Sequence, residues 1–102
     1  YPSYWVSVTD DPAFQDAVRC RWESLRLDRL SDDTLGDRIA ALAGQVADAE
    51  RRDNAQWDTI GTWVSPNSFV GETWEEELGF LEEWTLQRAA WLDRAFPGTC
   101  AG

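Results

Sequence analysis

The sequence predicts an all-α protein: a three-helix bundle with an ordered N-terminal arm and a long packed loop before the last helix. Three segments have apolar residues at the three- and four-residue spacing of an amphipathic helix, and each follows a helix-start signal. No alternating strand pattern exceeds the run from Trp5 to Val8. A chain of 102 residues makes one small domain, residues 1–102, whose core is limited because so short a chain buries only about 60–65% of its unfolded surface.

The arm, Tyr1 to Thr9, is expected to lay its apolar side chains on the bundle; these are Tyr4, Trp5, Val6 and Val8. The first helix is predicted to begin at Asp10-Asp11-Pro12, because an acidic cap and a proline in the first turn favour a helix start. It should end near Leu27 to Leu30. Its apolar stripe comprises Phe14, Ala17, Val18, Trp22 and Leu25.

The second helix is predicted to start after Ser31, whose hydroxyl can cap it, while Asp32 and Asp33 suit the positive end of the helix dipole. It should run to about Asn54 or Trp57. Its stripe comprises Leu35, Ile39, Leu42, Val46 and Ala49.

The loop from Asp58 to Glu72 is the one long irregular stretch. It is rich in apolar residues, so we expect its own side chains to pack it. Thr73 to Glu76 form a capping-box pattern that starts the third helix, and Pro97-Gly98 should end that helix. Its apolar stripe is so wide that we predict the central position in the bundle. The stripe comprises Trp74, Leu78, Phe80, Leu81, Trp84, Trp91 and Leu92.

The net charge of −10 argues against nucleic acid or an anionic membrane as the main partner, because phosphate binding needs clustered Lys and Arg. No apolar run approaches the length that a membrane span needs, so no membrane insertion is expected. All nine basic residues are Arg, and the chain has neither His nor Met. Because an initiator Met is missing, we expect a processed protein or a piece of a longer one.

The two cysteines, Cys20 and Cys100, are candidates for a disulfide that pins the C-terminal tail to the first helix. Closing so long a loop stabilises a fold by about 4 kcal/mol in the chain-entropy model. The alternative is two unpaired thiols in a cytosolic domain. An even cysteine count in a small acidic domain favours the disulfide and export.

Several kinds of chemistry are excluded or disfavoured. A chain with no Lys and no G-x-G-x-x-G loop cannot be a complete kinase of an ordinary kind. The lack of His excludes Ser-His-Asp and Cys-His catalysis and argues against zinc. The segment from Asp28 to Asp37 fails the spacing of a calcium loop. Glu72 and the run Glu75 to Glu77 are explained by the helix dipole, so we predict no catalytic, cofactor or metal residues.

The seven tryptophans allow a carbohydrate-binding interpretation, but most of them sit at helical core spacing. Trp57 and Trp63 are the least explained by that spacing, and Trp63 is the one we would expect to face a ligand. Arg beside aromatic residues suits structural ion pairs. Arg88 should pair with an acidic residue of the first helix or the loop, and Asp93 with an Arg of the first helix.

An ordered set of short motifs resembles the C-terminal region of the CotH family, the spore-coat-type secreted atypical protein kinases. The motifs are Arg21-Trp22-x2-Leu25-Arg26, Ala49-x2-Arg52-Asp53-x3-Trp57 and Trp84-x3-Arg88-x2-Trp91-Leu92-Asp93, with weaker matches at Trp5, at Asp11-Pro12-x-Phe14 and from Thr73 onward. Asp53 departs from the family, where Asn is common. The resemblance implies a secreted or surface protein whose ATP- and Mg²⁺-binding catalytic residues precede Tyr1, and none of the residues here inherits a catalytic role.

We therefore expect a non-catalytic C-terminal fragment that buttresses the upstream kinase-like lobe of the same protein. The alternative is a stand-alone exported helical module that contacts a protein or a glycan through its loop aromatics. The two differ in their surfaces: a buttress exposes an apolar patch where the lobe docks, whereas a stand-alone module has a closed, polar surface.

Overall fold

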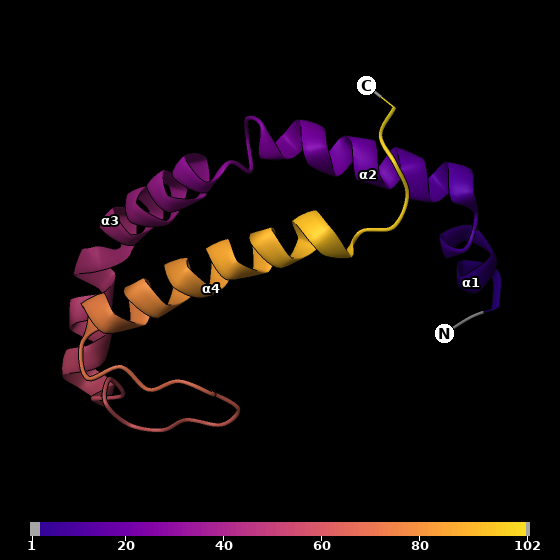
Figure 1. The fold of residues 1–102 in the computed structure, drawn as a ribbon. Helices are drawn as coiled ribbons and strands as arrows, with labels where there is room; N and C mark the ends of the chain where they lie inside the picture. The colour runs from indigo at the N-terminus through magenta and orange to yellow at the C-terminus, as the bar shows by residue number, and fades with distance from the viewer. Residues whose placement is uncertain (1–2, 102) are drawn as a thin grey trace. The chain divides into compact units, whose positions relative to one another are not determined.

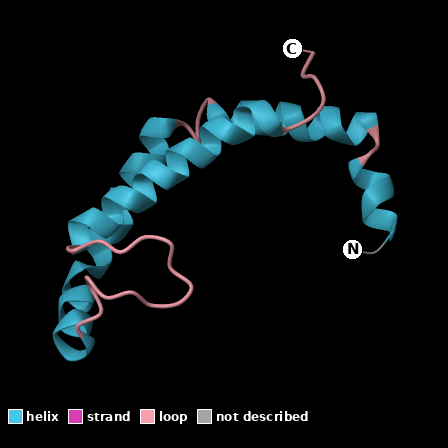
Figure 2. Cartoon of the chain, turned by 60° about the horizontal axis from the view of Figure 1, so that its bottom comes forward, coloured by secondary structure: helices cyan, strands magenta, loops and turns pink. Residues whose placement is uncertain are grey.

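The computed structural model describes residues 3–101 and contains four helices: α1 (Ser3–Thr9), α2 (Pro12–Arg26), α3 (Asp32–Trp57) and α4 (Trp74–Ala95), as Figure 1 shows. Figure 2 shows that the described residues hold helices and loops but no strand, which confirms the all-α class. The three long helices match the three predicted ones, and α1 is additional.

The chain divides into two compact units, and the boundaries fall within α3 and α4. The first unit comprises Tyr1–Thr34 with Gln87–Gly102, and the second comprises Leu35–Leu86. Each is described here by itself. The arrangement of the three long helices as one bundle, and the single domain of residues 1–102, stay predictions.

The start of α2 follows from the local chemistry of its cap. Asp11 is the N-cap residue, its side chain accepts a hydrogen bond of 2.8 Å from the amide of Ala13, and Pro12 occupies the first turn, where it costs no hydrogen bond. At the other end, the amide of Leu27 donates to the carbonyl of Glu23. The predicted start is confirmed, and the helix ends at Arg26, one residue before the predicted range of Leu27 to Leu30.

The predicted arm is a short helix, α1, with exposed side chains. Thr9 Oγ1 donates to the carbonyl of Trp5 at 2.9 Å, and Gln15 of α2 donates to the carbonyl of Thr9 at 2.9 Å. Trp5 remains 50% exposed, and its ring contacts that of Tyr4 at 5.2 Å. The arm is therefore ordered, but the prediction that its aromatic residues pack onto the other helices is wrong. Tyr1, its first residue, lies outside the described residues.

The C-terminal tail of the first unit leaves α4 and crosses α2 (Figure 1). The predicted stop at Pro97-Gly98 is confirmed, because α4 ends at Ala95. Gly98 has a φ of 90°, which favours glycine, and a Cβ added there would lie 2.6 Å from the backbone carbon of Gln15. The tail can approach α2 this closely only because residue 98 has no side chain.

In the second unit, hydrogen bonds hold the two ends of the loop between α3 and α4 together. The amide of Gly61 donates to the carbonyl of Gly71 at 3.0 Å. Near the end of the loop, the ring of Phe69 stacks on Phe80 of α4 at 4.3 Å. The middle of the loop is open, with Trp63 and Val64 exposed. The loop is thus packed at its end and exposed around its middle, which corrects the expectation of a packed loop throughout.

The start of α4 is the predicted capping box with one change. Thr73 Oγ1 accepts from the amide of Glu76 at 3.2 Å. The carboxylate of Glu76 accepts from the amide of Glu72 at 2.8 Å, one residue earlier than the usual reciprocal bond. Glu77 Oε1 accepts from the amide of Gly71 at 2.7 Å. These glutamates therefore complete backbone hydrogen bonds at the helix start.

Within each unit the apolar stripe of α4 is largely exposed, and the predicted central position of this helix in the bundle stays a prediction. Trp84 is 55% exposed, and Leu81 and Trp91 are each 48% exposed. Ala89 is the only hydrophobic residue that is buried between residues 3 and 101. The apolar stripe exists as the sequence predicts, but the segments that pack against α4 within each unit do not cover it.

Replacing Gly98 with Ala should destabilise the protein by about 2–3 kcal/mol, because Ala is strained at this φ and its Cβ collides with the α2 backbone. Urea unfolding at neutral pH measures the change. Gly44→Ala is the matched control, since a Cβ there meets no atom within 4 Å, and it should stabilise the helix by about 1 kcal/mol. Equal effects of the two substitutions would contradict the close approach of the tail.

Candidate functional site

Two side chains of α2 bind the carboxylate of Asp93, near the end of α4. Trp22 Nε1 donates to Oδ1 at 2.8 Å, and Arg26 Nε donates to the same oxygen at 3.0 Å. Arg26 Nη2 lies 3.3 Å from Oδ2, so the guanidinium binds the carboxylate through two nitrogens. Paired charged hydrogen bonds of this kind are stronger and more directional than neutral ones.

Arg26 connects three segments. Besides Asp93 it pairs with Asp32, at the start of α3, at 2.7 Å, and it donates to the carbonyl of Leu30. Its side chain is only 16% exposed. Arg26 lies on α2, which is the first of the three predicted helices. The predicted pairing of Asp93 with an Arg of that helix is therefore confirmed.

Arg19 completes this cluster from the same face of α2. Its Nη1 donates to the backbone carbonyls of Asp93, at 2.8 Å, and Phe96, at 3.3 Å. These carbonyls lie at the end of α4, where a helix leaves its last carbonyl groups without partners and where a cation is favoured. Glu23, one turn along α2, pairs with Arg19 Nε at 2.5 Å. We name Arg19, Trp22, Arg26 and Asp93 the Asp93 cluster.

The electrostatics keep both partners charged. Partial burial alone would raise the pKa of Asp93, but hydrogen bonds from Arg26 and Trp22, with the positive charges of Arg26 and Arg19, hold it below its usual value. For Arg26, burial acts to lower the pKa, and the carboxylates of Asp32 and Asp93 outweigh it, so the pKa is raised. The pair is therefore suited to holding structure and unsuited to donating or accepting protons near neutral pH.

A hollow of about 420 Å³ lies beside the cluster. Its lining residues are Arg19, Trp22, Glu23, Arg26, Leu27 and Asp93. Each charged side chain that lines it already has an oppositely charged partner in the part of the chain described. Such a site favours a structural role over binding of an anion.

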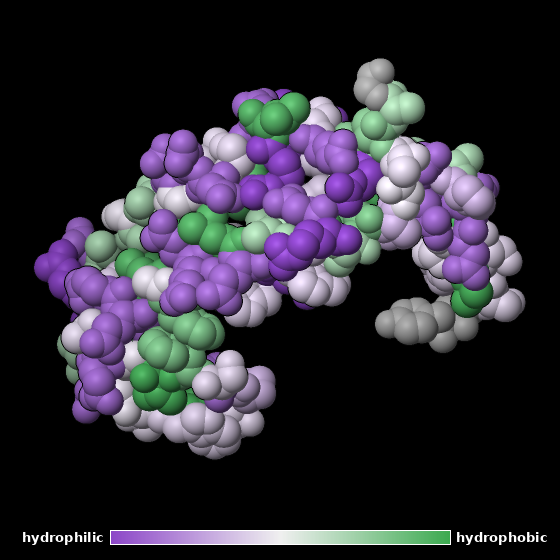
Figure 3. All heavy atoms as spheres, viewed as in Figure 1, coloured by the Kyte–Doolittle hydropathy of each residue, from purple (hydrophilic) through white to green (hydrophobic). Residues whose placement is uncertain are grey.

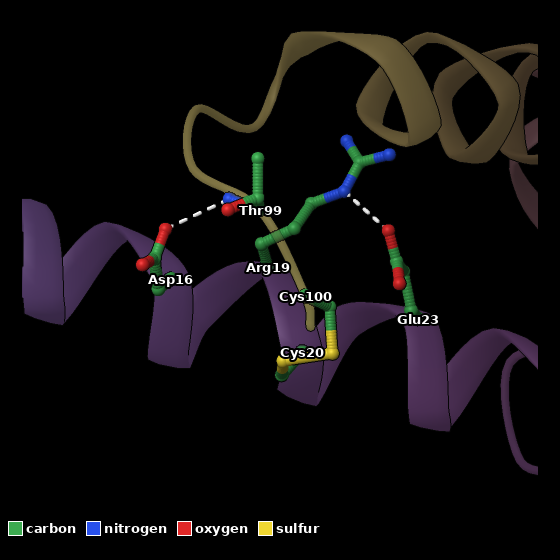
Figure 4. The surroundings of a disulfide bond; sticks show 6 residues. All are labelled: Asp16, Arg19, Cys20, Glu23, Thr99 and Cys100. Carbon is green, nitrogen blue, oxygen red and sulfur yellow. Dashed lines mark hydrogen bonds and ion pairs between the residues drawn. A yellow bond between two sulfur atoms is a disulfide. The ribbon is translucent and has the colours of Figure 1, made fainter. Parts of the chain in front are cut away.

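The two cysteines of the first unit form a disulfide between α2 and the tail, with an S–S distance of 1.97 Å. Figure 4 shows the tail lying along α2, with the Cys20–Cys100 bond beside Arg19 and Glu23. One residue before Cys100, the amide of Thr99 donates to Asp16 Oδ1 at 2.8 Å. The tail is thus joined to α2 by a covalent bond and by a hydrogen bond.

The second unit carries an apolar groove of about 390 Å³ along the first half of α4. The groove is lined by Ser68, Trp74, Glu77, Leu78, Phe80, Leu81 and Trp84. On the face seen in Figure 3, hydrophobic side chains gather where the loop meets the start of α4, and hydrophilic residues border them. We name the groove lined by these seven residues the α4 groove.

The other motif residues are dispersed. Leu25 and Leu92 are half-buried, Arg21 is exposed, and Trp22 packs on Phe96 with ring centroids 5.4 Å apart. Trp57 and Trp84 belong to the second unit, and Trp57 is 68% exposed. Within the first unit the structure joins Trp22, Arg26 and Asp93, and it separately places Arg88 against Trp91.

Among the described residues of the first unit, Arg88 forms no ion pair with an acidic residue of α2, the first helix that the sequence predicted. Its guanidinium lies over the ring of Trp91, 4.3 Å from the centroid. Residues three apart face each other on a helix, so a cation–π contact within α4 takes the place of the predicted ion pair.

Sequence reasoning missed Arg19. The signal that could have found it is the four-residue spacing to Glu23, which places the two side chains together on α2. Its second role, at the carbonyls of α4, depends on tertiary structure that no local pattern reveals.

Trp63, the predicted ligand contact, is 63% exposed in the loop of the second unit. Its Nε1 donates to the carbonyl of Asn67 at 2.9 Å, which fixes one edge of the ring. Between residues 3 and 101 there is no group of three or more metal-binding side chains. Over the same residues, none of the helices has both the length and the apolarity that crossing a membrane demands.

A comparison with protein-family models matches residues 3–92 to the family described as CotH kinase protein. The chain belongs to the CotH kinase protein family. The match extends from α1 to Leu92 of α4, one residue before Asp93. Searches of curated proteins and of solved structures found no significant match. The helices described here are thus a kinase-related segment of CotH type.

Replacing Asp93 with Asn should lower the free energy of unfolding at pH 7 by about 1–2 kcal/mol. The expected loss is no larger because the Asp93 side chain is 39% exposed, so solvent screens part of its interaction with Arg26. The folded-state pKa of Asp93 lies below its unfolded value of about 3.9, so its contribution is present above that pH and is lost as the pH falls through the folded value. Urea unfolding from pH 7 to pH 3 should show the two proteins converging in the acid range.

Asp37→Asn is the control for Asp93→Asn, because Asp37 is an exposed aspartate of α3 outside the cluster. It should change the free energy of unfolding by less than about 0.5 kcal/mol. A constant difference between the Asp93→Asn variant and the parent down to pH 3 would show that the carboxylate charge does not stabilise the fold.

Reducing the disulfide should add the mass of two hydrogens and destabilise the fold by about 4 kcal/mol, since the bond closes a loop with a sequence separation of 80 residues. Intact mass with and without reductant, followed by urea unfolding of both forms, measures the two effects. Cys20→Ser with Cys100→Ser should reproduce the loss. An unchanged mass would mean that the native thiols are free.

Proposed function

We propose that this CotH segment is a non-catalytic C-terminal part that buttresses the kinase-like lobe of a secreted or cell-surface protein. The observation that supports it best is the exposure of large apolar side chains. Ala89 alone among the hydrophobic residues between 3 and 101 is buried, while each helix has at least one aromatic residue that is at least 36% exposed. Contiguous exposed apolar surface marks a place where another structure packs.

The residues of the segment favour a structural role over a catalytic one. Phosphoryl transfer needs a cation at the phosphates and carboxylates that hold Mg²⁺. The chain has no Lys, and Asp93 is held by Arg26 and Trp22. In this proposal the upstream lobe binds ATP and Mg²⁺, and the segment contributes stability.

The Asp93 cluster gives the support a mechanism. It fastens the end of α4 to α2 within the first unit, and Arg26 extends the connection to Asp32 at the start of α3. A surface fixed in advance loses less conformational entropy when a partner packs on it. The first unit would therefore present its own exposed aromatic residues in one arrangement to the lobe.

An extracellular setting agrees with the chemistry of the tail. Disulfides form and persist in oxidising compartments, and the tail of this chain is joined to α2 by one. The association of the CotH family with spore coats points in the same direction. The substrates of such a kinase would be coat or surface proteins.

One observation favours the alternative of an exported binding module. Trp63 is 63% exposed, and its Nε1 is held by the carbonyl of Asn67, so the ring is presented to solvent in a fixed position. A ring presented in this way can stack on a sugar or on a protein side chain. A module of this kind would lose ligand binding when Trp63 is replaced.

The native protein detected with an antibody to this segment should have an intact mass several times 11.6 kDa. In that protein, Asp93→Asn should lower the melting temperature of the kinase-like lobe and leave the KM for ATP unchanged, because the residue supports the lobe and does not touch nucleotide. Trp63→Ala is the control and should change neither. A native species of 11.6 kDa, or loss of ligand binding in the Trp63→Ala variant alone, would favour the binding module.

A further inference from the structure

The α4 groove of the second unit is apolar and open. Phe80, Leu81 and Trp84 are 36%, 48% and 55% exposed although they are large hydrophobic residues. On one side Phe69 covers part of Phe80 by stacking on it. Within the second unit, the remaining surface of these three residues is left uncovered by α3 and by the loop.

The groove lies in the strongly acidic part of the chain. Residues 35–86 carry eleven Asp and Glu against three Arg, a net charge of −8 out of −10 for the whole chain. The first unit carries the remaining −2. Charge of one sign around an apolar surface selects a partner of the opposite sign and speeds its association.

The acidic residues are concentrated on the helix that forms the groove. Glu77 lines it, and Glu75, Glu76, Glu82 and Glu83 are on the same half of α4. The three Arg of this unit are all on α3, and Arg51 is paired with Asp48. None of the groove-lining residues is basic. An incoming cationic side chain would therefore find carboxylates beside the apolar wall.

We propose that the α4 groove docks a basic amphipathic helix, whose apolar side chains cover Phe80, Leu81 and Trp84 and whose Lys or Arg residues lie beside the glutamates of α4. Apolar anchors in a groove, flanked by charges of opposite sign, are the usual way in which a protein holds an amphipathic helix. The proposal rests on the proposed function in one respect: the helix would belong to the kinase-like lobe of the same protein.

The other occupants fit less well. A second copy of this chain would bring a second unit of charge −8 against the first, and like charges across an interface are unfavourable. An anionic membrane would be repelled for the same reason. A glycan needs several hydrogen-bonding groups, whereas the groove wall offers two polar side chains, Ser68 and Glu77.

The experiment uses two synthetic amphipathic peptides of about 18 residues, one of Leu and Lys and the other of Leu and Glu. Titration of each into the full 102-residue chain by calorimetry should show that the Leu/Lys peptide binds at least tenfold more tightly. Trp84→Ala should weaken the binding of the Leu/Lys peptide at least tenfold, because Trp84 would be a central anchor. Raising the salt concentration should weaken it as well.

Trp63→Ala is the matched control, because Trp63 is an exposed tryptophan of the same unit that does not line the groove. It should leave the dissociation constant within about twofold. Leu81→Asn is a second groove variant, which should act like Trp84→Ala, and circular dichroism checks that every variant keeps its helices.

Equal binding of the two peptides would overturn the proposal, because it would show apolar adhesion without charge selection. Equal losses from Trp84→Ala and Trp63→Ala would overturn it too, since the peptide would then bind elsewhere. Self-association of the chain that Trp84→Ala abolishes would assign the groove to a second copy. Peptide binding as predicted together with a native mass of 11.6 kDa would keep the groove but reject the buttress. If peptide binding fails but Asp93→Asn has its predicted effect on the lobe, the groove proposal is rejected and the buttress is kept.

Discussion

The first unit depends on the carboxylate of Asp93. This group accepts hydrogen bonds from Trp22 and Arg26 of α2, and so it fastens the end of α4 to a helix about seventy residues earlier in the chain. Arg26 also pairs with Asp32, so the same guanidinium reaches the start of α3. Partial burial of the two charged groups costs free energy, and their complementary partners offset that cost, whereas an unpaired charge in this position would destabilise the unit.

In the first unit, hydrogen bonds, ion pairs and a disulfide provide much of the stability that an apolar core provides in most small domains. Ala89 is the only almost fully buried hydrophobic residue of the described chain, and the other apolar side chains of the first unit that lie inward, such as Trp22, Leu25 and Phe96, are partly buried. The tail is instead held by the disulfide to Cys20, by the hydrogen bond from Thr99 to Asp16 and by the close approach that Gly98 permits. These bonds constrain the shape of the first unit, in which one hydrophobic residue, Ala89, is almost fully buried.

The sequence predicted the helix starts well because capping is local. Asp11, Ser31 and Thr73 each bond to an amide two or three residues later, and such a pattern is visible in the sequence itself. Tertiary relations were harder to predict. Arg88 lies over its helical neighbour Trp91, Arg19 reaches the carbonyls of α4, and the seven-residue α1 is too short and too rich in valine to be read as a helix. For the candidate site, the sequence indicated the type of partner for Asp93 but could not identify the cluster.

The difference between the predicted and the observed burial of α4 is itself informative. The apolar stripe through Phe80, Leu81 and Trp84 has the width of a covered helix, yet these side chains are exposed within their unit. A stripe of this width lowers solubility when nothing covers it, so the covering atoms should belong to another segment or another protein. The eleven acidic residues of the same unit restrict the chemistry of that cover, because only a basic partner gains from both the apolar wall and the charge around it.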